Sequence, residues 1–493
     1  MSERYPGKVN APEFPAGADW VNASGPLSLA DFKGKLLLLD FWAYCCINCM
    51  HVIPTLRQLE RRYPDDLAVV GVHSAKYDQE RATENIRHAV MRYGIRHPVV
   101  NDATMAIWRS YAVRAWPTLM FVDPTGKVIG RIEGEMTYDQ GTELIDKMIG
   151  EFKAAGTLRP SPPKLVLEQP PASLLSYPGK VLADPENERL FIADSGHHRI
   201  IVADLDGIVQ TVIGSGEEGL SDGVLEGAQF SHPQGMARFG ETLYVADTAN
   251  HAIRVVDLEA AIVETIAGTG QQGIGYVEGG AALEVDLRSP WDLSLVRRDL
   301  HIAMAGSHQI WTLNLDTNVV QATVGTGAES MVDGPPEEAA LAQPSGIAAD
   351  EEGVLYFADS ETSSVRFADT TTMHEVRTLV GSGLFDFGDA DGDGPTARLQ
   401  HPLGVDVDGE TIYVADTYNH KIRSIGIETG RVVTVAGSGE AGLVDGTTHE
   451  ACFFEPGGLS VSERVLYVAD TNNHVIRTVD LDTGDVASLE VDF

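Results

Sequence analysis

The sequence predicts a protein of two domains, an α/β sandwich followed by an all-β, six-bladed β-propeller. Residues 1–156 alternate continuous apolar runs with segments of helical spacing, which is typical of a sheet covered by helices. Residues 174–493 instead contain six copies of one block, with a period of 54 to 58 residues. Fifty glycines with only 7% aromatic residues agree with a turn-rich β protein.

The elements of the first domain follow from local patterns. Leu36–Trp42 is a continuous apolar run with one acid, Asp40, as expected of a strand covered on both faces. Asp123-Pro124-Thr125-Gly126 is a turn sequence between two apolar runs, so it predicts an antiparallel hairpin. The predicted strands are Leu36–Trp42, Leu67–His73, His97–Val100, Thr118–Val122 and Lys127–Ile132, and the predicted helices are Cys46–Arg62, Gln79–Tyr93, Met105–Tyr111 and Asp139–Phe152.

Residues 157–173 are predicted to link the two domains. The stretch is rich in proline, which favours an extended and semi-rigid connector. Within it, the apolar run Leu165–Leu167 is a candidate for an additional strand of the ring that follows. The prolines are Pro160, Pro162, Pro163, Pro170 and Pro171.

Each repeat opens with a proline and continues through a strand that usually ends in Ala-Asp, a tight turn, an Ile-Arg strand and a closing Gly-x-Gly. Four short strands repeated six times predict a propeller around a central channel. A β-solenoid is the alternative, but the first and last copies are close to the consensus instead of being atypical caps, which favours a closed ring. The opening prolines are Pro178, Pro233, Pro290, Pro344, Pro402 and Pro456.

The charge of the chain excludes several classes of partner. Its 493 residues include 72 acidic and 36 basic side chains, a net charge of -36. Because clustered lysine and arginine bind phosphate backbones and anionic lipids, we expect no nucleic-acid partner and no membrane. Residues 1–160 hold 19 acidic and 19 basic side chains, so the whole excess lies in the remaining 53 acidic and 17 basic ones. If charge selects the partner, that partner should be basic. The sequence does not predict the oligomeric state.

The composition also bears on the compartment. The chain has no stretch of eighteen apolar residues, and its first 35 residues lack the apolar core and cleavage site of a signal peptide. Four cysteines are too few for a disulfide framework in a chain of this length. We therefore expect a cytoplasmic protein.

Three of the four cysteines, Cys45, Cys46 and Cys49, fall within five residues between a predicted strand and a predicted helix. A Cys-x-x-Cys in that place puts the first sulfur at a helix N-terminus, where unpaired N–H groups and the helix dipole stabilise a thiolate. Cys46 is then the nucleophile toward a substrate disulfide, and Cys49 resolves the mixed disulfide. A zinc site is the alternative, but there is no second cysteine pair and His51 is the nearest further ligand, so we expect no metal and no cofactor.

Two sets of motifs resemble known families. Ala11-Pro-Glu-Phe14, Asp40-Phe-Trp-Ala43, Cys46-Ile-Asn-Cys49, Trp116-Pro-Thr118 and Asp123-Pro-Thr-Gly126 resemble thioredoxin-like domains of the TlpA/ResA subgroup. The recurring Tyr-Val-Ala-Asp-Thr-x-Asn-His turn with its following Ile-Arg resembles NHL-repeat β-propellers. In combination they resemble the NHL repeat-containing protein 2 family, in which a thioredoxin-like domain precedes a propeller.

The resemblance implies roles around the cysteines. Asp40 matches a buried carboxylate that accepts a proton from the resolving thiol, with an ordinary polar residue at a strand end as the alternative. Pro117 matches a cis-proline that faces the cysteines, where the backbone beside Trp116 pairs with an extended substrate segment. A trans-proline that starts a strand is the alternative. Trp42 belongs to the same motif as Asp40, and Trp116 is large enough to narrow the site.

Two departures separate the chain from thioredoxin. Ile47-Asn48 stands where thioredoxin has Gly-Pro, which changes the redox potential. Cys45 stands where thioredoxin has a tryptophan; a vicinal disulfide, exchange with the active pair and an inert buried thiol are all open, and we favour the inert thiol. The fourth cysteine, Cys452, aligns with polar positions of other repeats and is expected to be exposed on a loop.

Several recurring motifs of the propeller are expected to be scaffolding. The Gly-x-Gly-x-x-Gly runs lack the βαβ context of a dinucleotide site, and Asp389–Gly394 resembles a calcium loop that lacks the bidentate glutamate. We expect the Asp–Arg pairs, such as Asp247 with Arg254, to form turn bonds and ion pairs between blades. We also expect a scaffolding role for the turn histidines His198, His251, His308, His420 and His474.

Departures from the repeat are where function is most readily added. The third copy has Met304 and Ser307 where other copies have Asp and Asn, and the fourth has Thr362 and Ser363 in place of Asn-His. These four residues are candidate partner contacts. The sequence thus predicts a thiol-disulfide oxidoreductase whose propeller recruits a protein substrate or partner; a non-catalytic interaction scaffold is the alternative.

Overall fold

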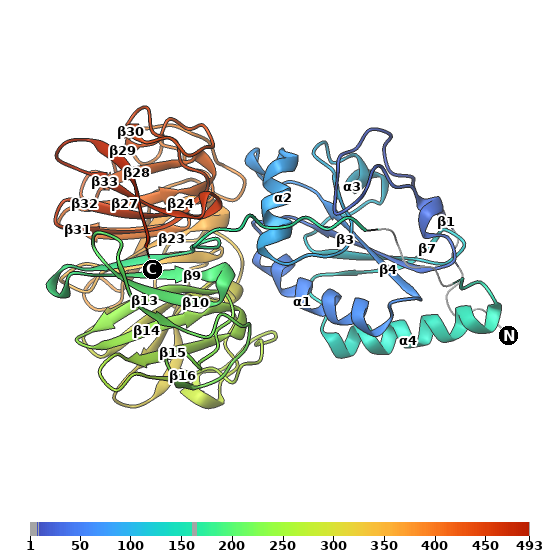
Figure 1. Ribbon diagram of the computed structural model, residues 1–493, viewed down its shortest axis with the longest axis horizontal. Coiled ribbons are helices and arrows are strands. Elements are labelled where there is room, and N and C mark those ends of the chain that lie inside the picture. Colours follow the sequence, from blue (N-terminus) through green and yellow to red (C-terminus); the bar gives the residue numbers. More distant parts are fainter. Residues whose placement is uncertain (1–6, 8, 160–164, 493) are drawn as a thin grey trace. The chain divides into compact units, whose positions relative to one another are not determined.

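The computed structural model in Figure 1 describes residue 7 and residues 9–159 and 165–492. The chain divides into two compact units, Met1–Ala172 and Ser173–Phe493, and each is described by itself. The predicted linker prolines Pro160, Pro162 and Pro163 lie outside the described residues. Among the described residues, no helix is both long and apolar enough to cross a membrane.

The first unit contains a seven-stranded mixed sheet with the order β1-β7-β6-β3-β4-β5-β2. Strands β3, β4 and β5 are parallel to one another, whereas β6 and β7 run antiparallel to their neighbours. The strands are β1 Val9–Asn10, β2 Trp20–Val21, β3 Leu36–Trp42, β4 Leu67–His73, β5 Val99–Asn101, β6 Thr118–Val122 and β7 Lys127–Glu133. The helices are α1 Ile47–Arg62, α2 Thr83–Arg92, α3 Ala106–Ser110 and α4 Tyr138–Ala155.

Strand β3 lies at the centre of this sheet and is buried along its whole length. Helices α1 and α4 cover one face, where Leu36 and Leu38 join the cluster that contains Leu56 of α1 and Ile145 of α4 (Figure 1). The side chains that alternate with them pack on the other face with those of α3. A strand enclosed on both faces is what its unbroken apolar run predicts.

The predicted bounds of β3, β4 and β6 are confirmed, and most other elements differ by one to three residues at their ends. The predicted helix Gln79–Tyr93 is wrong as a single element, because Ala82 is extended and separates a 3-10 turn from α2. Glu80 in that turn points inward, and its carboxylate accepts three backbone N–H groups, those of Cys45, Lys76 and Tyr77. This long-range role overrides the local helical pattern.

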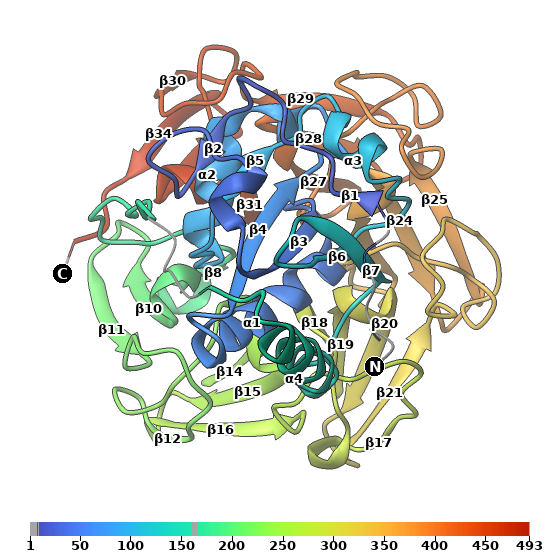
Figure 2. The ribbon, with the colours of Figure 1, turned by 90° about the vertical axis from the view of Figure 1, so that its right-hand side faces the viewer.

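In the second unit, six antiparallel sheets follow one another around a ring in chain order, so the six-bladed propeller is confirmed (Figure 2). Three two-residue strands in connecting loops extend blades two, three and six: β12 Gly223–Val224, β17 Gly280–Ala281 and β30 Gly446–Thr447. The blade strands are β8 Val181–Asp184, β9 Arg189–Asp194, β10 Arg199–Asp204, β11 Val209–Ile213; β13 Pro233–Phe239, β14 Thr242–Asp247, β15 Ala252–Asp257, β16 Ile262–Ala267; β18 Pro290–Val296, β19 Asp299–Met304, β20 Gln309–Asn314, β21 Val319–Val324; β22 Pro344–Ala349, β23 Leu355–Asp359, β24 Ser364–Asp369, β25 Glu375–Val380; β26 Gly404–Asp408, β27 Thr411–Asp416, β28 Lys421–Gly426, β29 Val432–Ala436; and β31 Pro456–Ser462, β32 Val465–Asp470, β33 Val475–Asp480, β34 Asp485–Leu489.

The second and third strands of each blade are joined by a 3-10 turn that ends in a residue with φ between 50° and 60°. Histidine, which tolerates this left-handed conformation better than most residues, fills the position in five blades, and Ser363 fills it in blade four. Each of these side chains accepts a backbone N–H from the next blade, as His420 does from Glu455 at 3.0 Å. The turn histidines are therefore scaffold residues.

The ring closes with the same bonds that join its other blades. Thr471 of blade six donates to the carbonyl of Pro178 in blade one at 2.8 Å, as Thr417 of blade five donates to Pro456 at 2.8 Å. The backbone of Asp492 also pairs with the chain around Ile208 in blade one. The predicted extra strand Leu165–Leu167 is wrong, since Leu165 instead pairs with Ala23 of the first unit.

A buried lysine ties several blades together across the centre of the ring. The ammonium group of Lys180 in blade one forms an ion pair with Asp292 of blade three at 3.1 Å. It also donates to the carbonyls of Ser345 in blade four and Leu403 in blade five. Burial lowers the pKa of Lys180 and raises the pKa of Asp292, so each charge depends on the other for its stability.

Replacing Lys180 by methionine should lower the free energy of unfolding of the propeller by about 3–5 kcal/mol, because Asp292 would remain buried without its counter-ion. Arg464→Met is the control, since its ion pair with Asp482 is more than half exposed, is screened by solvent and should contribute much less to stability. For both variants, urea unfolding monitored by hydrogen exchange of β18 measures the change in the free energy of unfolding. Equal effects of the two variants would show that the central ion pair is not a support of the ring.

Candidate functional site

The cysteine motif lies where the central strand of the first unit passes into its first helix. Strand β3 ends at Trp42, and Cys46 is the N-cap of α1, with an extended backbone. Its carbonyl accepts the N–H groups of Cys49 and Met50 at 3.0 and 3.1 Å. The Cys46 side chain is therefore at the end of the helix where unpaired N–H groups favour negative charge, and Cys49 lies one turn further along.

The two cysteines of the motif differ in their surroundings. Cys46 is 3% exposed and Cys49 is fully buried, and both are free thiols. Burial raises the pKa of the Cys49 thiol well above its usual value, a hydrogen bond with Cys46 raises it further, and the charge of Lys76 opposes these effects. Cys49 therefore needs a base if it is to react near neutral pH.

Asp40 is the buried carboxylate nearest in sequence to the motif. It lies on β3 opposite Gly71 of β4. Burial raises its pKa to about 7, and the charge of the neighbouring His97 counteracts part of that shift. A carboxyl group with this pKa exchanges its proton near neutral pH, which is the property that a general base for Cys49 requires.

Three buried polar atoms around Gly71 make no hydrogen bond to any described residue: Asp40 Oδ1, Trp42 Nε1 and His97 Nε2. A Cβ atom at Gly71 would lie 3.0 Å from Trp42 Nε1 and 3.5 Å from His97 Nε2. The glycine therefore leaves room beside these polar atoms, on the face of the sheet that α1 covers.

His97 connects this interior to a more exposed residue. Its Nδ1 lies 3.3 Å from Glu60 Oε2, and the Glu60 side chain is 26% exposed. Burial lowers the pKa of His97, but the charge and hydrogen bond of Glu60 and the charge of Asp40 together raise it by more, so the net shift is upward. His97 and Glu60 were not predicted as site residues, because neither belongs to the cysteine motif and only the fold brings them to Asp40.

The backbone just before Cys46 is held by two further residues that the sequence did not single out. His73 Nε2 accepts the N–H of Tyr44 at 3.3 Å, and burial lowers the pKa of His73 to about 3, so the ring is a neutral acceptor. Glu80 accepts the N–H of Cys45 at 2.9 Å. The thiol of Cys45 is buried beside these contacts.

Trp116 and Pro117 form a second part of the site. The Trp116–Pro117 peptide bond is cis, as the family resemblance implies. The indole N–H of Trp116 donates to the carbonyl of Ser74 at 2.8 Å, which fixes the ring. The ammonium of Lys76 lies 5.5 Å from the centre of the Trp116 ring and also acts electrostatically on Cys49, so the same lysine interacts with the tryptophan and with the buried thiol.

A metal at the motif finds no support among the described residues, where no three His, Cys, Asp or Glu side chains are grouped as ligands would be. His51, the nearest further ligand in the sequence, pairs instead with Glu135 at 2.8 Å. The acidic run that resembles a calcium loop is also engaged, because Asp389 and Asp391 both pair with Arg423.

The four candidate partner contacts in the propeller divide into two pairs. Thr362 and Ser363 are buried; Thr362 donates to the carbonyl of Asp359, and Ser363 accepts the N–H of His401, so we assign both to the fold instead of to a partner surface. Met304 and Ser307 line a pocket in blade three. Cys452, expected to be exposed, is half-buried and lies 3.2 Å from the hydroxyl of Ser438.

Comparisons with known proteins place this architecture in a family. A family model described as thioredoxin-like matches residues 34–128, and an NHL repeat model matches residues 399–423. NHL repeat-containing protein 2 of Bos taurus is 42% identical over 520 residues, which cover 97% of this chain and 71% of that protein. The chain belongs to the NHL repeat-containing protein 2 family.

Two other relatives match at comparable or lower identity. Protein SUPPRESSOR OF QUENCHING 1, chloroplastic, of Arabidopsis thaliana is 45% identical over 97% of this chain and 47% of its own length. Thiol-disulfide oxidoreductase ResA of Bacillus thuringiensis is 32% identical over 122 residues, which are 25% of this chain and 68% of that protein. The first unit is therefore a thioredoxin-like domain related to thiol-disulfide oxidoreductases.

The buried Asp40 should make the stability of the first unit depend on pH. Its folded pKa of about 7 lies above the value of about 3.9 in an unfolded chain, so the folded protein holds the proton more tightly. Stability should then fall as pH rises from about 4 to about 7, with a slope of up to about 1.4 kcal/mol per pH unit. Asp40→Asn mimics the protonated acid and should remove that slope, so the variant should be the more stable protein above pH 7.

Urea unfolding at a series of pH values measures the effect. His97→Ala is the matched variant: because His97 lowers the pKa of Asp40, its loss should extend the falling range to higher pH. Parallel curves of stability against pH for the wild type and Asp40→Asn would contradict the raised pKa of Asp40.

Proposed function

We propose that the protein is a thiol-disulfide oxidoreductase in which Cys46 and Cys49 are the reacting pair. The observation that carries the proposal is the position of Cys46 at the N-cap of α1, with Cys49 one turn on and a carboxylate of pKa about 7 beneath the same helix. The relationship of the first unit to thiol-disulfide oxidoreductases supports it.

In the proposed reaction, the Cys46 thiolate attacks one sulfur of a substrate disulfide, and the departing sulfur takes a proton from solvent. Cys49 then gives its proton to Asp40 and attacks the sulfur of Cys46, which breaks the mixed disulfide and releases the second substrate sulfur as a thiolate that takes a proton from solvent. The substrate gains two electrons, and the Cys46–Cys49 pair becomes a disulfide. A cellular thiol reductant returns the pair to the dithiol.

Asp40 acts in this scheme as the base for Cys49, whose buried thiol loses its proton only with difficulty. His97 contacts Glu60, whose side chain is partly exposed. The two residues therefore suit the return of that proton from Asp40 to solvent. Pro117 and Trp116 bound the site where an extended substrate segment would pair with the backbone. Trp42 positions the end of β3 from which the motif begins.

The propeller is proposed to recruit or orient the protein substrate or partner. It carries the whole net charge of -36, so a basic partner is favoured. The proposed compartment is the cytoplasm, a reducing environment in which Cys46 and Cys49 remain available as thiols. The alternative is a scaffold in which the thioredoxin-like domain holds partners without turnover.

The full chain should accelerate the reduction of a disulfide-bonded substrate protein by dithiothreitol, and Cys46→Ser should abolish that acceleration because the nucleophile is lost. Cys452→Ser is the matched control, since it removes a thiol outside the motif and should leave the rate within about twofold. The rise of free substrate thiols measures the activity. Equal rates for the wild type and Cys46→Ser would overturn the proposed activity.

Cys49→Ser should instead accumulate a mixed disulfide between Cys46 and its substrate, because the resolving thiol is missing. Non-reducing gels and mass spectrometry of the trapped species identify the bond. A scaffold without turnover would trap nothing, so this variant separates the proposed enzyme from its alternative.

The resolving step should accelerate as pH rises through about 7, because Asp40 is an effective base only in its carboxylate form. Asp40→Asn should slow that step by about 100-fold at pH 7 and shift its acceleration to the higher pH at which the Cys49 thiol ionises without help. Rapid-quench measurement of the release of a substrate thiol from the mixed disulfide gives the rate. An unchanged pH profile in Asp40→Asn would contradict the role of Asp40.

A further inference from the structure

Four blades of the propeller share one ionic arrangement, in which an arginine and one aspartate are buried and a second aspartate is half-exposed. In each, an arginine on the third strand pairs with the aspartate that ends the second strand and with an aspartate on the loop that precedes the blade. Arg366, for example, lies 2.9 Å from Asp359 and 2.9 Å from Asp333. The sets are Asp247, Arg254 and Asp222 in blade two; Asp359, Arg366 and Asp333 in blade four; Asp416, Arg423 and Asp391 in blade five; and Asp470, Arg477 and Asp445 in blade six.

A fourth polar residue completes the arrangement in three of these blades. Asn250, Asn419 and Asn473 each donate to a loop carbonyl at 2.7 Å and to the aspartate of the second strand at 2.8 Å. In blades two, four and six the arginine also donates to carbonyls of the loop, so the arrangement holds the preceding loop against its blade. The expected pairing between blades is therefore corrected: the Asp–Arg pair lies within one blade and fastens the connecting loop to it.

Blade three replaces all four members together. Met304 ends its second strand where the other blades have aspartate, and Trp311 stands at the arginine position of its third strand. Tyr276 follows Gly273 by three residues, as Asp222 follows Gly219, and both glycines donate to the matching carbonyls of Leu287 and Phe230. Ser307 stands at the asparagine position, and its enclosed hydroxyl makes no hydrogen bond to any described residue.

These four residues line one pocket of about 260 Å³ in blade three. An ionic group replaced by apolar residues of similar volume commonly gives a filled core. Here the replacement leaves a hollow instead: Met304 and Trp311 are buried, whereas Tyr276 is 87% exposed and the neighbouring Ile274 is 68% exposed. The pocket therefore has a buried apolar floor and an exposed apolar rim.

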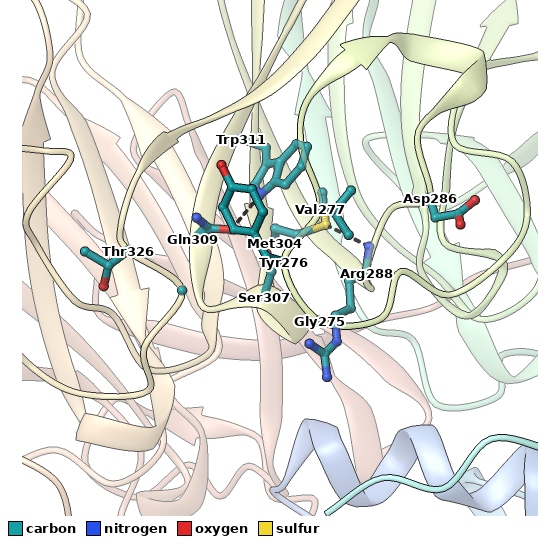
Figure 3. A pocket seen from close by; sticks show the side chains of 11 residues that line it. Gly275, Tyr276, Val277, Asp286, Arg288, Met304, Ser307, Gln309, Trp311 and Thr326 are labelled. Carbon is teal, nitrogen blue, oxygen red and sulfur yellow. Dashed lines mark hydrogen bonds between the residues drawn. The ribbon is translucent and has the colours of Figure 1, made fainter. Parts of the chain in front are cut away.

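The surroundings of Trp311 show which groups face the pocket. Gln309 Oε1 accepts the indole N–H at 3.1 Å, while Gln309 Nε2 donates to the carbonyl of Gly325, so Gln309 fixes the indole. Figure 3 shows the Tyr276 ring in front of Gln309 and Trp311, with Met304 beside them. The carboxylate of Asp286 points away from this group.

The chemistry of the lining selects the ligand. Two aromatic rings and a thioether favour a flat apolar group, through stacking and sulfur–aromatic contacts. The loss of the Asp–Arg–Asp set removes three charged groups from this position, and the charged residues that remain in the lining are Asp286 and Arg288. The Ser307 hydroxyl remains as a partner for one polar substituent, and a pocket of this size holds a single ring system.

We propose that the pocket of blade three binds a small neutral aromatic ring that carries one hydrogen-bonding group. The ring comes either from a free aromatic compound or from an aromatic side chain that a partner protein presents. The site is independent of the cysteine chemistry, and its function does not rest on the proposed oxidoreductase activity.

Binding is tested with indole and with a capped Gly-Ser peptide that contains one tryptophan, each titrated into the full chain and followed by ligand-observed NMR. The key variant restores the arrangement of the other blades: Tyr276→Asp, Met304→Asp, Ser307→Asn and Trp311→Arg together. Blades two, five and six show that this set packs, and a thermal melt checks the folding of the variant. The proposal expects indole to bind the wild type at least about tenfold more tightly than the restored variant.

A second variant tests the hydrogen bond. Ser307→Ala keeps the apolar walls, so it should weaken indole by about fivefold and leave indene, which has the same shape without the N–H, unchanged. Binding of the peptide as well as indole assigns a partner side chain as the source of the ring, and binding of indole alone assigns a free compound. No binding to the wild type, or equal binding to the wild type and the restored variant, would overturn the proposal.

Discussion

The complete burial of strand β3 is the constraint on which the first unit depends. Because both of its faces are covered, the strand sits at the centre of the sheet and fixes where α1 begins. The same burial takes Asp40 out of water and raises its pKa to about 7, at the end of the strand that leads to the cysteines. The packing that stabilises the domain therefore also sets the proton chemistry that the proposed reaction needs, and His97 with Glu60 moderates it.

Buried charge organises the propeller in a different way. Repeated Asp–Arg–Asp sets fasten the connecting loops of four blades, and Lys180 joins blades across the centre. Such groups are costly to bury singly and acceptable only when each partner is present. Blades depart from the arrangement to different degrees: blade four keeps the aspartates and the arginine but has Thr362 at the asparagine position, whereas blade three has Met304, Trp311, Tyr276 and Ser307 in place of all four members. Blade three thus combines four departures from the repeat at one position of the ring.

Local sequence patterns predicted the elements whose structure depends mainly on residues close to them in the sequence. Apolar runs gave the bounds of β3, β4 and β6, and the cysteine spacing placed Cys46 at the start of α1. The inward turn of Glu80, which breaks the predicted helix, includes a hydrogen bond from the N–H of Cys45, which comes from a distant segment. His97 and Glu60 were missed for the same reason. The repeat pattern predicts Thr362 and Ser363 as partner contacts because it shows that they are polar departures but does not show that they are buried. Met304 and Ser307, the other two predicted contacts, line a pocket.

Cys46 and Cys49 are proposed to form a two-electron redox pair. The most direct measurement is the reduction potential of the full chain, obtained by equilibration with thiol-disulfide buffers and mass spectrometry of the Cys46–Cys49 peptide. The account predicts one reversible transition between dithiol and disulfide, within the range of about -270 to -120 mV that thiol-disulfide oxidoreductases span. Absence of a Cys46–Cys49 disulfide across that whole range would contradict it.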